Sequence, residues 1–258
     1  MTPDVVVDIG NTRMKWGRCE AGRVTQTFAM PLDSPAAWTA QFAAWDLDTR
    51  RLTWVVASVN PAVTARFSEW VASFDGILVQ VGHFSQVPLQ LAVQQPEKVG
   101  IDRLLTALAA NRMADERPAI VVNIGTAVTC DLVDDAGTFL GGAIFPGPQL
   151  MARSLHDYTA KLPLIDAGNL HTVNCPGRDT QQAIELGIAS AVGSAIMRLI
   201  AVYSEQLDSP PVVFFTGGGM EPFTDVEADE MWTPDPNDTR FVPTLTLEGI
   251  RLAAEEML

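Results

Sequence analysis

The sequence predicts a mixed α/β protein in which one folding unit occurs twice. A Val-rich run that ends in a glycine turn and is followed by a second apolar run starts at residue 5, and the same pattern returns near residue 120. Two apolar runs around a short glycine turn are typical of a β-hairpin. Segments with helical apolar spacing follow each copy. Coincidence is the alternative to a duplication, because Val-rich strands that end in glycine are common.

The first copy opens with a strand over Val5–Val7, which leads into Asp8-Ile9-Gly10-Asn11-Thr12 and a return strand over Met14–Gly17. A third β-like stretch covers Arg23–Met30. The spacing of the apolar residues then predicts a strand over Leu52–Val59 and helices over Ala62–Phe74 and Ile101–Ala114.

In the second copy, Ile120–Val122 leads into Asn123-Ile124-Gly125-Thr126, and the next two strands cover Val128–Val133 and Thr138–Phe145. Asn123 takes the place of Asp8, 115 residues further along the chain. A long helix is predicted over Asp179–Gln206, with Asp179 and Gln182 as a capping box. The remaining elements are a strand over Pro211–Thr216, a helix over Leu247–Leu258 and loops over Asp208–Pro211 and Trp232–Asp238. We therefore expect two halves, residues 1–115 and 116–258.

Composition limits the class of protein. The 258 residues are 47% hydrophobic and 19% charged, which excludes a disordered or fibrous chain. With 17 Lys and Arg against 31 Asp and Glu, the net charge is −14. A nucleic-acid surface recruits Lys and Arg, so no nucleic-acid partner is expected. A phosphate-bearing ligand would have to be held by backbone N–H groups and metal ions instead.

Cysteine usage and apolar runs indicate where the protein resides. Cys19, Cys130 and Cys175 are scattered and show no metal-binding spacing, which fits a reducing compartment. The first residues lack the pattern of a signal peptide. No apolar run approaches the roughly 20 residues of a membrane span. We expect a cytoplasmic protein with no membrane partner.

Asp8 and the turn after it offer three kinds of group to a nucleotide. Backbone N–H groups of a glycine turn bind phosphate oxygens, the Thr12 hydroxyl can donate a hydrogen bond, and Asp8 can hold a hydrated Mg²⁺. Lys15 adds a positive charge nearby. An ordinary hairpin turn is the alternative, and the second copy favours phosphate binding.

The second copy and a later glycine turn extend this hypothesis. Gly125-Thr126-Ala127 would hold the other side of the phosphate chain, while the Asn123 amide, which carries no charge, would either bind a cation weakly or cap its turn. Three glycines at 217–219 would let the backbone approach a base or ribose, although a merely flexible turn is equally consistent. The spacing differs from the dinucleotide-binding fingerprint.

Gly100-Ile101-Asp102-Arg103 stands at the start of a predicted helix. A carboxylate in a first helical turn is favoured by the helix dipole alone, which is the structural interpretation. Beside a glycine and Arg103, Asp102 is also a candidate base for an anionic substrate.

Taken in order, these motifs resemble those of the type III pantothenate kinases. The matching segments are Asp8-x-Gly-Asn-Thr12, Gly100-x-Asp-Arg103, Gly125-Thr-Ala127, Pro146-Gly147, Leu162-Pro163, Arg178-Asp-Thr180, Thr216-Gly-Gly218 and Leu245-Thr-Leu-Glu-Gly249. The resemblance extends from residue 5 to about residue 252.

The resemblance implies a fold, an activity and partners. The fold is that of acetate and sugar kinases and actin-like ATPases, with two ribonuclease-H-like halves around a nucleotide cleft. The activity is transfer of the γ-phosphoryl group of ATP to the terminal hydroxyl of pantothenate, the first step of coenzyme A synthesis. Mg²⁺ and a monovalent cation, K⁺ or NH₄⁺, are the implied cofactors. The family is typically a homodimer whose pantothenate pocket lies near the subunit interface.

The resemblance also assigns roles to residues. Asp102 would be the general base, and Asp8 would hold Mg²⁺ through water. The implied ATP contacts are Asp8, Ile9, Gly10, Asn11, Thr12, Arg13, Met14, Lys15 and Thr126. The implied pantothenate contacts are Val93, Gly100, Ile101, Asp102, Arg103 and Thr180.

Two positions depart from the family. Asn123 stands where the family usually has an aspartate that holds the monovalent cation, so we expect a weak or altered potassium requirement. Val93 stands where the family often has a tyrosine that contacts pantothenate, so substrate affinity is expected to be lower unless another residue compensates.

Two other functions compete with this one. A kinase of the same fold that acts on a sugar or acetate is disfavoured by Gly100-x-Asp-Arg103 and Arg178-Asp-Thr180. A degenerate regulator that binds nucleotide without turnover is favoured by Asn123 and Val93 and disfavoured by Asp8 and Asp102.

Overall fold

The computed structural model describes residues 2–47, 51–168, 170, 175–219 and 238–257. By their contacts these residues form two compact units, one from residues 1–113 and 244–258 and one from residues 114–243. The expected halves differ from these units in one element, because the last helix packs with the first unit. The loop expected over Trp232–Asp238 lies, except for its last residue, outside the described residues.

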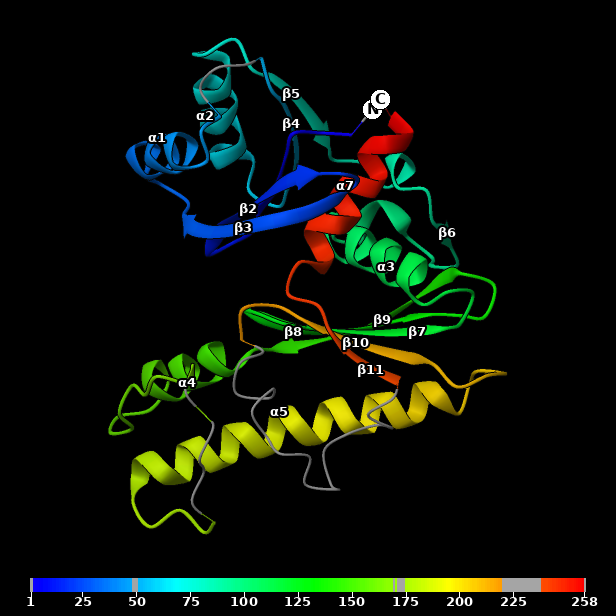
Figure 1. The fold of residues 1–258 in the computed structure, drawn as a ribbon. Coiled ribbons are helices and arrows are strands. Elements are labelled where there is room, and N and C mark those ends of the chain that lie inside the picture. The colour runs from blue at the N-terminus through cyan, green and yellow to red at the C-terminus, as the bar shows by residue number, and fades with distance from the viewer. Residues whose placement is uncertain (1, 48–50, 169, 171–174, 220–237, 258) are drawn as a thin grey trace. The chain divides into compact units, whose positions relative to one another are not determined.

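The first unit is built on a five-stranded sheet (Figure 1). In sheet order its strands are β3 (Arg23–Pro31), β2 (Arg13–Glu20), β1 (Val5–Ile9), β4 (Thr53–Ser58) and β5 (Ile77–Val81). β1 to β3 pair antiparallel, whereas β4 and β5 run parallel to β1. β1 lies in the centre, which explains its continuous valine run, since a central strand is covered on both faces.

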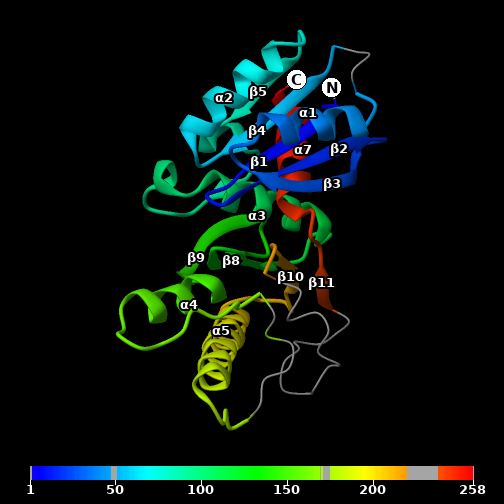
Figure 2. The same ribbon diagram turned by 90° about the vertical axis from the view of Figure 1, so that its left-hand side faces the viewer.

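Four helices cover this sheet, two on each face (Figures 1 and 2). α1 (Pro35–Ala44) and α2 (Pro61–Ala72) pack on one face, and α3 (Ile101–Met113) and α7 (Leu245–Met257) lie on the other. Between α2 and α3 run β5, two 3₁₀ turns at Phe84–Gln86 and Pro96–Lys98, and the short strand β6 (Gln90–Leu91). The core under α1 and α2 is aromatic, with Trp16, Trp38, Trp54 and Phe67 fully buried.

The second unit repeats the plan of the first. Its strands follow the order β11 (Thr239–Phe241), β10 (Val212–Thr216), β7 (Ala119–Ile124), β8 (Ala127–Val133) and β9 (Thr138–Pro146). β7 to β9 pair antiparallel, whereas β10 and β11 run parallel to β7. This is the pairing pattern of β1 to β5, so the predicted duplication is confirmed. Asn123 near the end of β7 thus corresponds to Asp8 near the end of β1.

One face of the second sheet is covered by α4 (Pro148–Asp157) and α5 (Thr180–Ser204) (Figure 1). Asp179 caps α5 by accepting a hydrogen bond of 2.8 Å from the backbone N–H of Gln182. A capping box also requires the Gln182 side chain to accept from the N–H of Asp179. This part of the prediction is wrong, because the Gln182 side chain accepts from the N–H of Arg178 instead, at 3.1 Å.

α5 differs from the expectation that no apolar run approaches the length of a membrane span. It has 25 residues and is long and apolar enough, by length and composition, to cross a membrane. Every fourth residue from Ile184 to Ile200 is buried against the sheet, as in a core-facing helix of a globular domain. The apolar character of this face therefore follows from its packing.

Most predicted elements are present within about two residues of their expected ends. The strands and helices expected over 52–59, 62–74, 101–114, 211–216 and 247–258 correspond to β4, α2, α3, β10 and α7. The sequence patterns predict no element at α1, α4, β5, β6 or β11. The apolar pattern is weak in β5, which is the edge strand next to β4 and leaves Ile77 39% exposed.

Candidate active site

The first predicted loop connects β1 to β2. The N–H of Gly10 donates to the carbonyl of Arg13 over 3.1 Å and closes the turn, which leaves Asn11 and Thr12 exposed. Asp8 and Lys15 are direct partners across the antiparallel pair. Their side chains therefore share one face of the sheet, next to a turn whose backbone is open to a ligand.

Burial dominates the electrostatics of this pair. Burial raises the pKa of Asp8 from 3.8 to about 6, the charge of Lys15 opposes the shift, and the charge of Asp102 adds to it. Burial also lowers the pKa of Lys15, against the opposing effect of Asp8. Two carboxylates predicted from separate motifs are therefore close enough for the charge of Asp102 to act on Asp8.

Asp102 lies in the first turn of α3 and is half-buried. Its Oδ1 atom lies 2.5 Å from the position that a Cβ on Gly100 would take. Ile101 is buried, whereas Arg103 is half-buried and engaged in an interaction of its own. Val93 is half-buried in the segment between β6 and the second 3₁₀ turn.

The second predicted loop connects β7 to β8. Gly125 closes it by donating to the carbonyl of Ala127 over 3.0 Å, and Thr126 is exposed. Gly147, the residue before α4, donates to the carbonyl of Thr126 over 2.9 Å. A Cβ on Gly147 would collide with the carbonyls of Gly125 and Thr126, so only glycine permits this contact. Gly147 was part of a recognised motif, but its support of the loop was not predicted.

The glycine turn after β10 packs on the same loop. Gly219 donates to the carbonyl of Ile124 over 2.9 Å. Gly217 has φ +104°, and a Cβ there would collide with Ile124 and lie 2.6 Å from the Asn123 Oδ1 atom. The turn therefore lies against Asn123 with no room for a side chain. This close packing argues against the alternative of a merely flexible turn.

Thr180 lies at the start of α5. It borders an open groove of about 670 Å³ between α4 and α5. The groove is mainly apolar, and its lining includes Met151, Leu155, Leu162, Ile184 and Ile188.

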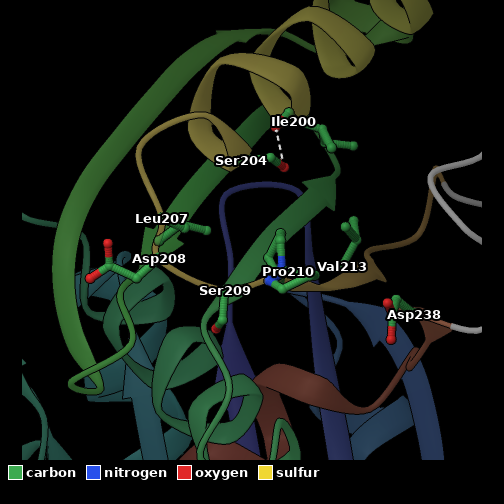
Figure 3. A pocket seen from close by; sticks show the side chains of 9 residues that line it. Ile200, Ser204, Leu207, Asp208, Ser209, Pro210, Val213 and Asp238 are labelled. Carbon is green, nitrogen blue, oxygen red and sulfur yellow. Dashed lines mark hydrogen bonds between the residues drawn. The ribbon is translucent and has the colours of Figure 1, made fainter.

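A further cavity of the second unit contains none of the predicted site residues. It has a volume of about 420 Å³ and lies beside the end of α5 and the start of β10 (Figure 3). Its polar groups are largely engaged: Ser204 donates to the carbonyl of Ile200, Ser209 to Asp135, and Asp238 pairs with Arg117.

Protein side chains do not form a complete metal site in the described part of the chain, where no group of three or more His, Cys, Asp or Glu is arranged around one point. Mg²⁺ in phosphoryl-transfer sites is typically bound by one or two carboxylates, waters and the phosphates of the substrate. Asp8, with Asp102 close enough to raise its pKa, fits that kind of site.

The sequence is similar to those of known kinases along its whole length. Residues 5–202 match the family model of the type III pantothenate kinases. The type III pantothenate kinase of Desulfovibrio desulfuricans is 32% identical over 97% of this chain and 96% of its own length. That of Persephonella marina is 30% identical over 95% of each chain.

Solved structures show the same fold. The activator of 2-hydroxyisocaproyl-CoA dehydratase from Clostridium difficile, determined with bound ADPNP, has a TM-score of 0.59 at 13% identity and covers 100% of this chain and 97% of its own. MreB5 of Spiroplasma citri, determined with ADP, has a TM-score of 0.51 at 8% identity, covering 100% of this chain and 97% of its own. The chain therefore has the actin-like ATPase fold, as predicted. By its sequence along nearly the full length, it belongs to the type III pantothenate kinase family.

Proposed function

We propose that this protein transfers the γ-phosphoryl group of ATP to the terminal hydroxyl of pantothenate, the first step of coenzyme A synthesis, with Asp102 as the general base. One observation carries the proposal beyond family membership. The carboxylate of Asp102 interacts with that of Asp8, which stands beside the glycine turn of β1 and β2. A base and a phosphate-binding turn are therefore present in one unit.

The reaction needs positioning and charge neutralisation more than covalent chemistry from the protein. Asp102 accepts the proton of the pantothenate hydroxyl, the hydroxyl oxygen forms a bond to the γ-phosphorus, and the bond to the β–γ bridging oxygen breaks to release ADP. In this proposal the pantothenate contacts next to Asp102 are Gly100, Ile101 and Arg103. Val93, earlier in the chain, is a further proposed contact.

In this proposal the loop between β1 and β2 holds the phosphates of ATP. The turn from Ile9 through Arg13 and Met14 offers exposed backbone around Gly10 and Asn11, with the Thr12 hydroxyl and the Lys15 ammonium beside it. Thr126, on the loop between β7 and β8, is a proposed ATP contact of the second unit. Asp8 would hold Mg²⁺ through water, and that ion would neutralise negative charge on the triphosphate. The half-buried position of Asp8 supports this, since an adjacent cation would offset the desolvation that raises its pKa.

A monovalent cation, K⁺ or NH₄⁺, is proposed at Asn123. The amide oxygen faces the tight turn at Gly217, where carbonyl groups are also close. Without a carboxylate the site lacks one negative charge, so its cation affinity is expected to be weak.

The α4–α5 groove supports a homodimer with Thr180 near the subunit interface. The groove is open and mainly apolar. An exposed apolar surface of this kind is typical of a protein interface.

We propose that the enzyme acts in the cytoplasm, consistent with its three free cysteines.

The test is a direct assay of phosphopantothenate formation. Purified protein is incubated with ATP, Mg²⁺ and pantothenate, with KCl, NH₄Cl or NaCl in parallel. We expect product, and we expect Asp102→Asn to lower the rate about 10²- to 10⁴-fold, the range for a lost general base. Asp208→Asn, an exposed carboxylate of the cavity in Figure 3, is the matched control and should retain activity.

Two results would overturn the proposal. Nucleotide binding without product under any cation would indicate a degenerate regulator or another acceptor. If Asp102→Asn formed product at an undiminished rate, the proposed reaction would stand, but Asp102 would not be its general base.

A further inference from the structure

Two buried hydroxyl groups join the helix that carries Asp102 to the last helix of the chain. The Thr106 hydroxyl on α3 donates to the backbone carbonyl of Asp102, 2.6 Å away and one helical turn earlier. The Thr246 hydroxyl on α7 lies 2.9 Å from the Thr106 hydroxyl. Thr106 is 2% and Thr246 9% exposed, so water does not replace these bonds easily.

The direction of the hydrogen bonds follows from the number of protons. Each hydroxyl has a single proton, and a carbonyl only accepts. Because the Thr106 proton goes to Asp102, Thr246 must donate to the Thr106 oxygen. The result is a chain from Thr246 through Thr106 to the backbone of Asp102.

α7 is itself held firmly against α3 and the sheet. Gly249 packs so tightly on the Leu105 carbonyl of α3 that a Cβ at this position would collide with it. Glu248 accepts from the N–H of Val24 in β3 at 2.8 Å and pairs with Arg251 at 2.7 Å. α7 is therefore a rigid support between the sheet and the first turns of α3.

We infer that Thr106 and Thr246 are positioning residues for Asp102, which they hold at the depth and rotation required for proton transfer. The inference rests on the proposed role of Asp102 as general base. An ordinary hydrogen bond from a helical threonine to the carbonyl four residues earlier needs no partner on another helix. The link to Thr246 couples the backbone of the base to a segment 140 residues away.

The experiment compares Thr246→Val and Thr106→Val, which keep the side-chain shape and remove the hydroxyl, with Thr246→Ser and Thr106→Ser, which keep the hydroxyl. A small displacement of a reacting group has large effects on rate. We expect each valine variant to lower kcat about tenfold while the KM for ATP stays within about twofold, and each serine variant to stay within about threefold of the parent.

The control for a purely structural effect is Thr64→Val on α2. Thr64 is also buried and donates to the carbonyl four residues earlier, Asn60, at 3.0 Å. We expect it to lower thermal stability about as much as Thr106→Val and to leave kcat unchanged.

A double-mutant comparison separates the inference from the proposed function. In an Asp102→Asn background, Thr246→Val should lower the residual kcat less than twofold, because there is no base left to position. An equal loss in both backgrounds, or no loss in the parent, overturns the inference alone. Full activity of Asp102→Asn overturns the base assignment and the inference together.

Discussion

The Asp102 carboxylate occupies the space in which a side chain on Gly100 would begin, with Oδ1 2.5 Å from the position of that Cβ. The contact involves the end of a movable side chain rather than a backbone atom. A methyl group at residue 100 would therefore displace the carboxylate and leave α3 intact.

Gly100→Ala should lower kcat about tenfold or more and change the melting temperature little, because a group moved by about 1 Å loses much of its effect. Steady-state kinetics and thermal unfolding of the same preparation check this. Gly82→Ala is the control, since its Cβ would approach only the Gln80 side chain. Full activity in Gly100→Ala would show that the carboxylate finds an equally productive position.

Asp8 should make the stability of the metal-free protein depend on pH. Its pKa is raised from 3.8 to about 6, so the folded state binds the proton more tightly than the unfolded state. The free energy of unfolding should fall as pH rises from about 4 to about 6, by on the order of 3 kcal/mol in total, and level off above that. Asp8→Asn should lack this slope and should be inactive.

Urea unfolding of both proteins between pH 4 and pH 8 in EDTA measures the effect. The two curves of stability against pH should converge at low pH, where Asp8 is protonated. Parallel curves over the whole range would mean that Asp8 titrates normally.

Gly217→Ala should impair nucleotide binding and stability. The residue has φ +104°, and its Cβ would collide with the Ile124 carbonyl beside the Asn123 amide. Gly22→Ala separates backbone strain from collision, because Gly22 has φ +74° with open space around it. We expect a loss of about 1 kcal/mol for Gly22→Ala from strain alone. Gly217→Ala should lose more stability than Gly22→Ala and should bind ADP at least tenfold more weakly in calorimetry. Equal stability and equal ADP affinity of the two variants would contradict a tight turn at Gly217.

Glu248 should be a major contributor to stability. Its side chain is 8% exposed and that of Arg251 10%, at 2.7 Å from each other. Glu248→Ala leaves Arg251 with Glu255, at 2.8 Å, as its remaining partner and removes the acceptor of the Val24 N–H, so it should cost about 2 kcal/mol. Glu256→Ala breaks a pair with Arg112 whose side chains are 54% and 56% exposed, and it should cost less than about 1 kcal/mol. Chemical denaturation of both variants tests the difference, and similar losses would argue against a special role of the α7 anchor.

Asn123→Asp should change the response to cations. The parent lacks the carboxylate that the family usually places at this position, so we expect weak activation by potassium. The aspartate variant should show steeper activation at lower KCl concentration, because a carboxylate adds a negative charge to the site. Titration of activity with KCl and NH₄Cl, at constant ionic strength, compares the two proteins. Steep potassium activation of the parent would show that the amide suffices.

Local patterns predicted most of the secondary structure and the duplication. The valine runs of β1 and β7 and the glycine turns after them depend on residues adjacent in sequence, and so do the helices α2, α3 and α5. The candidate residues near Asp8, Asp102 and Asn123 were found from motifs for the same reason.

The tertiary structure decided what depends on contacts between distant segments. The packing of α7 with the first unit rests on Glu248 and Gly249 meeting β3 and α3, more than 140 residues away in sequence. The pKa of Asp8 depends on burial and on Asp102, neither of which a pattern reports. The hydroxyl chain from Thr246 to Asp102 likewise exists only because two helices pack closely enough. Sequence periodicity determines which face of an element is buried, whereas the partner on that face is set by folding in three dimensions.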